Sequence, residues 1–297
     1  MVDVKNAEIS IYNNRLSVQI SYPGAVYKGS RFDWNGFITQ VTLDGRHTFC
    51  VPESLISGKG SGGQGFCGEF GIEEGLGYND TYVNNYFAKI GVGQLKKIDS
   101  KPYDFFRIYP VVPHGCDITL TTQKVSFHGK PVIIDDYSYE YLKEIELKNN
   151  FLVISYTLKN IGSKKIQTTE YCHNFIGIDN NMVSSSYILK IPGNINLENT
   201  VGGIRIAEDG SLTWPQYEQK QEFYCIVKGY NAAPGYSWEL YNSNARVGLR
   251  EINDFQVSKL AIWGSRHVIS PEAFIRLELE PGQTQRWIRK YEFFFKK

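Results

Sequence analysis

The sequence has little net charge, few cysteines and no long apolar run. Its 32 lysines and arginines face 31 aspartates and glutamates, a formal net charge of +1 over 297 residues. This even balance does not supply the basic surface that nucleic-acid binding requires, so we expect no nucleic-acid partner. No stretch approaches the ~20 consecutive apolar residues that cross a bilayer, so we expect no membrane partner. A hydrophobic content of 42% argues against a disordered chain.

Cysteine is sparse and widely spaced. The five residues are an odd number and form no CxxC pair: Cys50, Cys67, Cys116, Cys172 and Cys225. This pattern favours buried free thiols over a disulfide framework or a zinc knuckle. The five histidines also lack the short spacing typical of a metal site, and we expect neither a metal nor another cofactor. The first residues lack the charged and apolar regions of a signal peptide, which predicts a cytoplasmic protein.

No convincing amphipathic helix is present, whereas short strands and tight turns recur. Tyrosine, phenylalanine and tryptophan make up 14% of the chain and favour β structure. The predicted hairpin arms are residues 8–12 with 15–22, 37–43 with 47–51, 143–147 with 151–158, 204–207 with 211–214, and 274–279 with 285–294. Strands at this spacing predict an all-β sandwich or barrel. No spacer divides the chain, so we expect one domain over residues 1–297.

A glycine-dense stretch at residues 57–77 interrupts this pattern. We expect a long loop there, and long loops inside a compact β domain are often functional. Residues 58–63 match GxGxxG. The dinucleotide-binding form of that motif needs a strand before it and a helix after it, and neither is predicted here.

Two segments carry candidate catalytic residues. Residues 168–179 place His173 in a strand-like run between aromatic residues, and residues 270–275 place Glu272 just before the last predicted hairpin. Cys172 and His173 point to opposite faces of a strand, so they cannot form a nucleophile–base pair. Taken singly, a strand histidine is more often structural, and a glutamate at a strand start is more often a surface residue.

Together, these segments resemble the galactose mutarotase-like family, the aldose 1-epimerases and their hexose-6-phosphate relatives. Residues 171–178 are similar to a family strand motif in which a histidine precedes an aromatic–aliphatic pair. Glu272, the turn at residues 279–283 and the aromatic run 287–295 are similar in order to the family's late glutamate, Leu-x-Pro-Gly-Glu turn and closing strand. The resemblance covers most of the chain in order.

Two further segments extend the resemblance and also depart from it. Residues 87–89 are similar to the family's His-Gly-Phe-Ala-Arg segment, with Asn85 at the place of its first histidine and Lys89 at the place of its arginine. Residues 62–71 are similar to its Arg-Gly-Gly-Ile-Pro loop, with Ser61 where the arginine would stand. Lysine keeps the cation but loses the bidentate fork of arginine. These departures leave the sugar and its phosphorylation state open.

The resemblance implies a β-supersandwich of two large, mostly antiparallel sheets with a sugar site on a concave face. It implies interconversion of aldose anomers, with an acid and a base on opposite sides of the hemiacetal. We expect His173 to protonate the ring oxygen and Glu272 to accept the proton of the C1 hydroxyl. The other residues expected to bind the sugar are Lys89, Glu69, Trp263, Asn85, Arg31, Trp34 and Tyr171.

Two other functions fit the same sequence. The first is a non-catalytic carbohydrate-binding or sensing protein on the same scaffold, because a fold does not determine an activity. The second is a different enzyme of this scaffold, such as a lyase or isomerase acting on acidic or oligomeric sugars. The sequence leaves the oligomeric state open.

Overall fold

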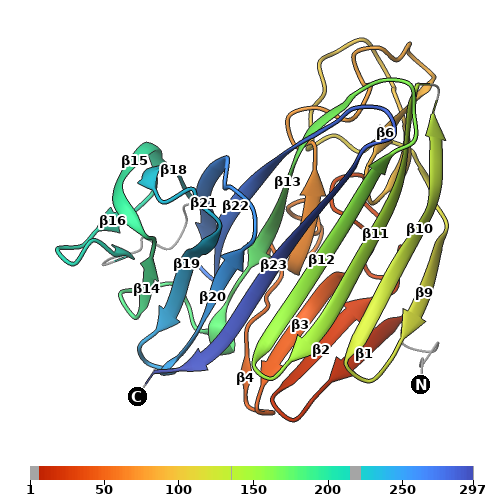
Figure 1. Ribbon diagram of the computed structural model, residues 1–297. Coiled ribbons are helices and arrows are strands. Elements are labelled where there is room, and N and C mark those ends of the chain that lie inside the picture. The colour runs from red at the N-terminus through yellow and green to blue at the C-terminus, as the bar shows by residue number, and fades with distance from the viewer. Residues whose placement is uncertain (1–6, 135, 215–221, 297) are drawn as a thin grey trace.

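The structure is a computed structural model that describes residues 7–134, 136–214 and 222–296. Two ten-stranded antiparallel sheets and one small three-stranded sheet make up the molecule (Figure 1). Among the described residues the only helical element is the 3-10 turn η1 (Ile178–Asn180). The predicted all-β fold with two large antiparallel sheets is confirmed.

The first sheet carries both candidate catalytic residues, His173 and Glu272. Its strands, in spatial order, are β1 (Glu8–Tyr12), β2 (Leu16–Ser21), β3 (Phe37–Leu43), β5 (Gly65–Phe70), β13 (Ile166–Phe175), β22 (Val268–Leu279), β21 (Lys259–Ser265), β18 (Phe223–Tyr230) and β15 (Gly193–Val201). The short strand β4 (His47–Thr48) pairs with β3.

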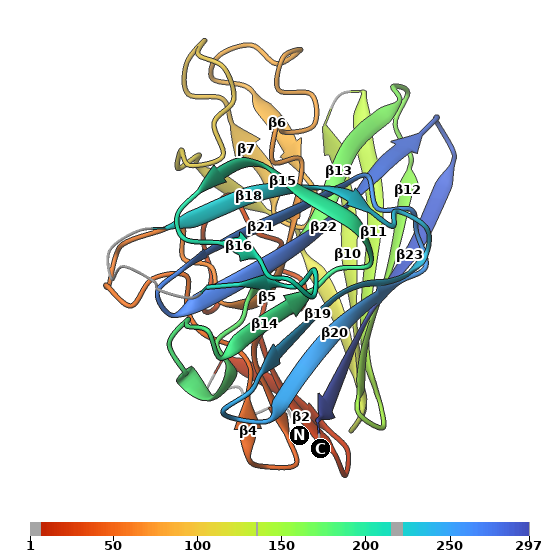
Figure 2. The ribbon, with the colours of Figure 1, turned by 90° about the vertical axis from the view of Figure 1, so that its left-hand side faces the viewer.

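The second sheet packs against the first. Its strands, in spatial order, are β16 (Arg205–Ile206), β17 (Leu212–Thr213), β14 (Tyr187–Lys190), β19 (Gly235–Asn242), β20 (Val247–Asn253), β23 (Thr284–Phe295), β12 (Phe151–Asn160), β11 (Tyr137–Lys148), β10 (Lys124–Ile134) and β9 (Cys116–Leu120). The small sheet consists of β6 (Tyr86–Lys89), β7 (Gly93–Lys96) and β8 (Val111–Pro113). In Figure 2, β6 and β7 lie at the top of the molecule.

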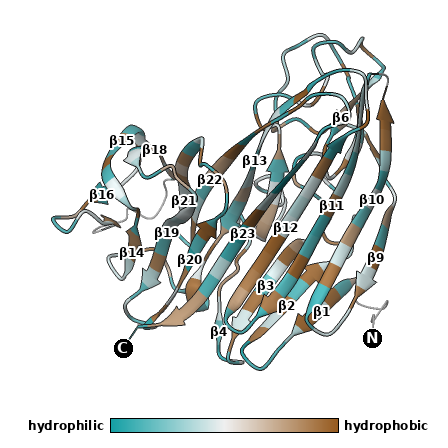
Figure 3. Cartoon of the chain, viewed as in Figure 1, coloured by the Kyte–Doolittle hydropathy of each residue, from teal (hydrophilic) through white to brown (hydrophobic). Residues whose placement is uncertain are grey.

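Alternation along the strands builds the core between the two large sheets. In β11 and β12 nearly every second residue is buried, which places one side of each strand against the first sheet. Apolar and polar residues accordingly alternate along many strands in Figure 3. In β13 the last six residues are all buried, because this strand has the second sheet on one side and a cavity with its covering loops on the other.

A buried network of ion pairs joins the two large sheets through this core, directly behind the cavity. Arg289 of β23 donates hydrogen bonds to Glu170 of β13 at 2.6 Å and to Glu251 of β20 at 2.7 Å. All three side chains are fully buried. The indole nitrogens of Trp287 and Trp238 donate to the same two carboxylates. This network connects the strand that carries His173 to the second sheet.

The predicted hairpins agree with the structure at four of the five turns. The pairs β1–β2, β3–β4, β11–β12 and β16–β17 form around the expected turn residues. The fifth prediction is wrong in its pairing. Strands β22 and β23 lie near the expected positions, but β22 pairs with β13 and β21, whereas β23 pairs with β12 and β20. The turn between them passes from one sheet to the other.

The glycine-dense stretch is only partly the expected loop. The fully buried strand β5 (Gly65–Phe70) runs through it and pairs with β13 along the cavity. Glycine is needed at Gly65, where φ is +58° and an added Cβ would clash with the Ile38 carbonyl oxygen. The five cysteines are free, and all but Cys116 are buried, which agrees with the prediction of buried thiols.

Candidate active site

A cavity of about 690 Å³ opens on the first sheet, on the side that faces away from the second sheet. The even-numbered residues of β13 face the second sheet, since Glu170 accepts a hydrogen bond from Arg289 and Asn174 Oδ1 accepts one from Tyr291 OH. The odd-numbered residues, Tyr171 and His173, therefore point into the cavity. Neighbouring strands β18, β21 and β22 and loops from the first third of the chain complete the wall.

Strand register brings His173 and Glu272 together. The ladder between β13 and β22 ends at the pair Glu170–Ile275 and resumes as a bridge at Ile176–Ile269. Counting three residues along each strand from either pair places His173 opposite Glu272. Pro271 has no N–H to offer a ladder, and the Asn174 side chain donates instead to its carbonyl at 2.6 Å. The two side chains thus face each other where the ladder is interrupted.

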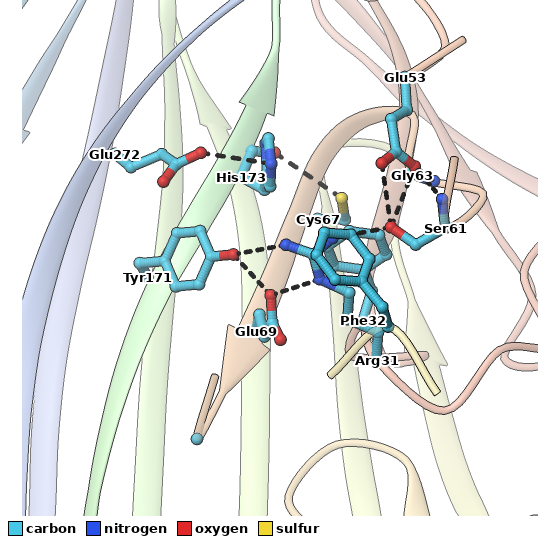
Figure 4. A network of polar contacts seen from close by, with 12 residues as sticks. Arg31, Phe32, Glu53, Ser61, Gly63, Cys67, Glu69, Tyr171, His173 and Glu272 are labelled. Atoms are coloured by element: carbon cyan, nitrogen blue, oxygen red, sulfur yellow. Dashed lines mark hydrogen bonds and ion pairs between the residues drawn. The ribbon is translucent and has the colours of Figure 1, made fainter. Parts of the chain in front are cut away.

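The two functional groups are in direct contact. His173 Nε2 lies 3.3 Å from Glu272 Oε1 (Figure 4). They share the cavity, as expected, but they lie side by side and leave no gap the width of a sugar ring between them. The His173 and Glu272 side chains are 5% and 7% exposed, so both are largely shielded from water.

Ser270 sets the tautomer of the histidine. Its Oγ accepts a hydrogen bond from the Asn174 backbone N–H at 2.9 Å and donates one to Glu272 Oε1 at 3.2 Å. With the hydroxyl proton assigned to that bond, the 2.8 Å contact with His173 Nδ1 has Nδ1–H as the donor. The lone pair of Nε2 then faces Glu272. We assign this tautomer from the hydrogen-bond network.

Burial shifts the pKa values of these two groups in opposite directions. Desolvation, and secondarily the charge of Arg31, lower the pKa of His173 well below its usual value. Desolvation raises the pKa of Glu272 to about 8, although Arg31 and Ser270 oppose the shift. At neutral pH the carboxyl group therefore keeps its proton and the imidazole is neutral, so two uncharged groups lie in contact.

Aromatic rings surround the histidine and account for this desolvation. The ring centroid of His173 lies 4.0 Å from that of Phe175, which it stacks on, and 5.2 Å from that of Trp263. Phe32 approaches edge-on at 5.9 Å. Beside it, Tyr171 stacks on Phe274 at 4.3 Å. These rings also present flat apolar faces with polar edges, the form of surface that suits a sugar ring.

Arg31 is the main cation of the cavity wall. Its Nε donates to Glu69 at 2.8 Å, Nη1 to Ser61 Oγ at 2.8 Å and Nη2 to Tyr171 OH at 3.1 Å (Figure 4). A guanidinium has five N–H donors, so two remain for a ligand. Its Cζ lies 4.6 Å from the ring centroids of both Phe32 and Phe105. The guanidinium is thereby held in a fixed position.

Glu69 and Lys89 lie behind the cavity wall instead of lining it. Glu69 is fully buried and accepts hydrogen bonds from Arg31 and, at 2.5 Å, from Tyr171 OH. Lys89 Nζ lies 3.6 Å from the other carboxylate oxygen and donates to Tyr103 OH at 3.0 Å. Burial lowers the pKa of Lys89 to about 8. Both residues are placed to position Arg31, Tyr171 and Tyr103, which line the cavity.

The expected sugar-binding residues therefore separate into three groups. Arg31, Tyr171 and Trp263 line the cavity with the His173–Glu272 pair. Glu69 and Lys89 support that wall from behind. The other two lie elsewhere: Asn85 is exposed in the turn before β6, and the Trp34 indole donates to the Gly29 carbonyl beside two smaller aromatic clusters.

Sequence reasoning missed several residues that line the cavity. They are Phe105, Phe106, Tyr224, Lys259 and Phe274, with the carboxylates of Glu53, Glu73, Asp104 and Glu222. The paired aromatics at residues 105–106, inside a loop, were an available signal. Ser270 was also missed, because a serine beside a proline has no distinctive pattern.

The described residues contain no group of three or more histidine, cysteine, aspartate or glutamate side chains placed to hold a metal ion. In the same part of the chain, no helix has the length and apolar character needed to cross a membrane.

No family model matches the sequence, and no curated protein is detectably similar to it. Solved structures do match. A galactose mutarotase-like protein from Lactobacillus casei superposes with a TM-score of 0.63 at 14% identity, covering 97% of this chain and 100% of the other. The Slr1438 protein from Synechocystis gives 0.61 at 10% identity, with 97% and 96% covered. The GalM/aldose epimerase homologue from C. elegans gives 0.56 at 8% identity, with 98% and 99% covered. The chain therefore has the galactose mutarotase-like fold.

Proposed function

We propose that the protein is an aldose 1-epimerase-like enzyme that interconverts the anomers of a sugar. The observation that carries the proposal is the contact between His173 and Glu272, a candidate base and a candidate acid at the wall of a cavity lined with aromatic faces. The expected cytoplasmic location is part of the proposal, and the partner is a small-molecule sugar.

Side-by-side groups suit this reaction. Anomer interconversion requires a proton on the ring oxygen and removal of a proton from the C1 hydroxyl. Both oxygens are bonded to C1, so an acid and a base in contact can reach both from one side of the ring. This arrangement replaces the expected one, in which the two groups stood on opposite sides of the hemiacetal.

The opposite pKa shifts of the two groups favour the reverse of the expected roles. Glu272 begins protonated and donates to the ring oxygen, while the Nε2 lone pair of His173 accepts the proton of the C1 hydroxyl. The C1–O bond of the ring breaks as the aldehyde forms, which leaves an imidazolium beside a carboxylate. After rotation about C1–C2 the steps reverse and close the ring as the other anomer. Ser270 holds Nδ1–H throughout, so that Nε2 is the atom that takes the proton.

The other cavity residues would orient the sugar. The two free N–H groups of Arg31 can donate to sugar hydroxyls, and Trp263 offers a stacking face next to His173. Glu69 keeps the guanidinium in place from behind. Binding of the sugar places the two reacting oxygens against Glu272 and His173, whose side chains lie in contact in the free protein.

Polarimetry or NMR of freshly dissolved aldoses in weak buffer tests the proposal. We expect acceleration by the wild type and a loss of about 10²–10⁴-fold in kcat in both His173→Asn and Glu272→Gln. Matched controls are His128→Asn, exposed on β10, and Glu278→Gln, exposed on the same strand as Glu272; both should retain activity.

Unchanged activity in either His173→Asn or Glu272→Gln would refute the assigned mechanism. Thermal stabilisation by sugars without any acceleration would instead favour the non-catalytic carbohydrate-binding protein.

A further inference from the structure

The mouth of the cavity carries an exposed aromatic side chain. Phe106 lines the cavity and is 67% exposed. It lies 4.1 Å from Phe105, centroid to centroid, with the two rings inclined by 37°. Phe105 in turn covers Arg31. An aromatic strip therefore leads from the guanidinium near the catalytic pair outward to the solvent.

The loop that presents Phe106 is firmly held. Tyr103 stacks on Tyr109 at 5.7 Å and meets Tyr78 edge-on at 5.4 Å. The backbone N–H of Phe106 donates to the Asp104 side chain at 2.9 Å, and Arg107 pairs with Asp99. A single exposed phenylalanine is ordinary. One that is fixed at the mouth of a cavity, next to a second aromatic ring, is placed to stack against a ligand.

Carboxylates dominate the charges that line the cavity. Glu53, Glu73, Asp104 and Glu222 line the cavity, against the cations Arg31 and Lys259. The charge of Arg31 is already paired with the buried Glu69. Carboxylates accept hydrogen bonds from hydroxyl groups and repel phosphate and uronate. The mouth therefore suits an uncharged, hydroxyl-rich ligand.

The volume is also large for one sugar ring. Pockets of roughly 300–1,000 Å³ hold drug-sized ligands. The cavity here is about 690 Å³, and a single hexose is smaller than most such ligands. A hexose with its C1 at His173 and Glu272 leaves the outer part, with Phe106 and Asp104, unfilled.

We propose that the cavity takes the reducing end of a neutral disaccharide or longer oligosaccharide. The reducing unit lies at His173 and Glu272, the next unit stacks on Phe106, and its hydroxyls donate to the carboxylates of the mouth. This inference rests on the proposed function for the reaction, but the binding it describes is measurable without turnover.

The test compares glucose, the reducing disaccharides maltose, cellobiose and lactose, and glucose 6-phosphate. We expect a higher kcat/KM for at least one disaccharide than for glucose, and the lowest value for the phosphate. Phe106→Ala should lower kcat/KM for that disaccharide about tenfold, as expected for the loss of one aromatic face, and change the value for glucose less than twofold. The control is Ile108→Ala, since Ile108 is 87% exposed on the same loop and does not line the cavity.

Calorimetric binding of the same sugars to Glu272→Gln separates the two proposals. Tighter binding of a disaccharide than of glucose, lost in the double variant with Phe106→Ala, supports the inference even if no sugar is turned over. Preference for glucose or its phosphate, or an equal effect of Phe106→Ala on glucose and disaccharide, would overturn it. Acceleration of glucose alone would leave the proposed function standing and remove only this inference.

Discussion

Ser270 Oγ contacts both members of the proposed catalytic pair, lying 2.8 Å from His173 Nδ1 and 3.2 Å from Glu272 Oε1. Ser270 Oγ also accepts the Asn174 N–H, and we assign its proton to the bond with Glu272. This arrangement holds the imidazole proton on Nδ1. In the proposed reaction, a residue on the same strand as the glutamate would thus determine which nitrogen of the histidine acts as the base.

Ser270→Ala should therefore impair turnover more than binding. Without the hydroxyl, Nδ1–H loses its acceptor and the proton is free to move to Nε2, the atom that must accept the sugar's proton. We expect kcat to fall about 10–100-fold, within the range of acid–base catalysis, with little change in KM. ¹⁵N NMR of the imidazole should show a shift toward the Nε2–H tautomer.

Ser155→Ala, on β12 of the second sheet, is the control for that variant and should leave both readouts unchanged. A fall in activity without any tautomer shift would assign Ser270 a purely structural role.

The pH dependence of activity should reflect the raised pKa of Glu272. The reaction as proposed needs the protonated carboxyl group, so kcat should decline as the pH rises through about 8, where that proton is lost. On the acid side His173 must stay neutral. Since burial lowers its pKa, activity should persist below the usual histidine pKa of about 6.5.

Stopped-flow polarimetry across pH 5–10 measures this profile. Activity that instead falls on acidification near pH 6.5 and stays level through pH 8 would contradict the assignment of the proton to Glu272.

Folding stability should also depend on the protonation of Glu272. The folded-state pKa of Glu272 is raised above its unfolded value, so its contribution is fully present below the unfolded pKa of about 4.3 and is lost as the pH rises through about 8. Urea unfolding at pH 5 and pH 9 should therefore show a larger loss of stability for the wild type than for Glu272→Gln. An equal loss in both proteins would show that Glu272 does not titrate in this range.

Arg289→Met should destabilise the fold without altering the cavity lining. The variant leaves the buried carboxylates of Glu170 and Glu251 without their shared cation. Breaking a buried ion pair from one side typically costs about 3–5 kcal/mol, and we expect a loss of that size in urea unfolding.

The triple variant Glu170→Gln, Arg289→Met, Glu251→Gln removes the charges together and should recover much of this loss. If Arg289→Met is as stable as the wild type, water or a change in protonation compensates the two carboxylates, and the network is not what joins the sheets.

Local patterns predicted the strands well because turn chemistry is local. The Asn13-Asn14 and Asp44-Gly45 turns form where expected, and Asp44 and Gly45 both adopt the positive φ that such turns require. The same logic failed at residues 280–282. A tight turn shows that two strands meet end to end, but it does not show whether they pair or enter different sheets.

In the candidate site, too, the sequence indicated which residues matter but not how the strands bring them together. His173 and Glu272 stood out through ordered segments, and the structure places them 3.3 Å apart. The contact itself depends on the register of β13 against β22, which no local pattern specifies. Glu69 and Lys89 have the residue types of ligand-binding groups. The pairing of Glu69 with Tyr171 directs both side chains to the same face of the sheet, but Arg31 and Tyr171 bind Glu69 and bury it, and Lys89 lies beside it.

The sequence by itself determined an all-β chain, most of its strands and turns, its buried thiols, and the histidine and glutamate around which a site could form. These follow from side-chain alternation, turn residues and ordered segments, all readable along the chain. Only the tertiary structure decided that the two groups touch, that Ser270 selects the tautomer, and that Phe106 stands at the mouth. Such contacts depend on the pairing of strands that are far apart in the sequence. The pKa values depend on burial, since rings packed around His173, such as Phe32 and Trp263, come from other parts of the chain.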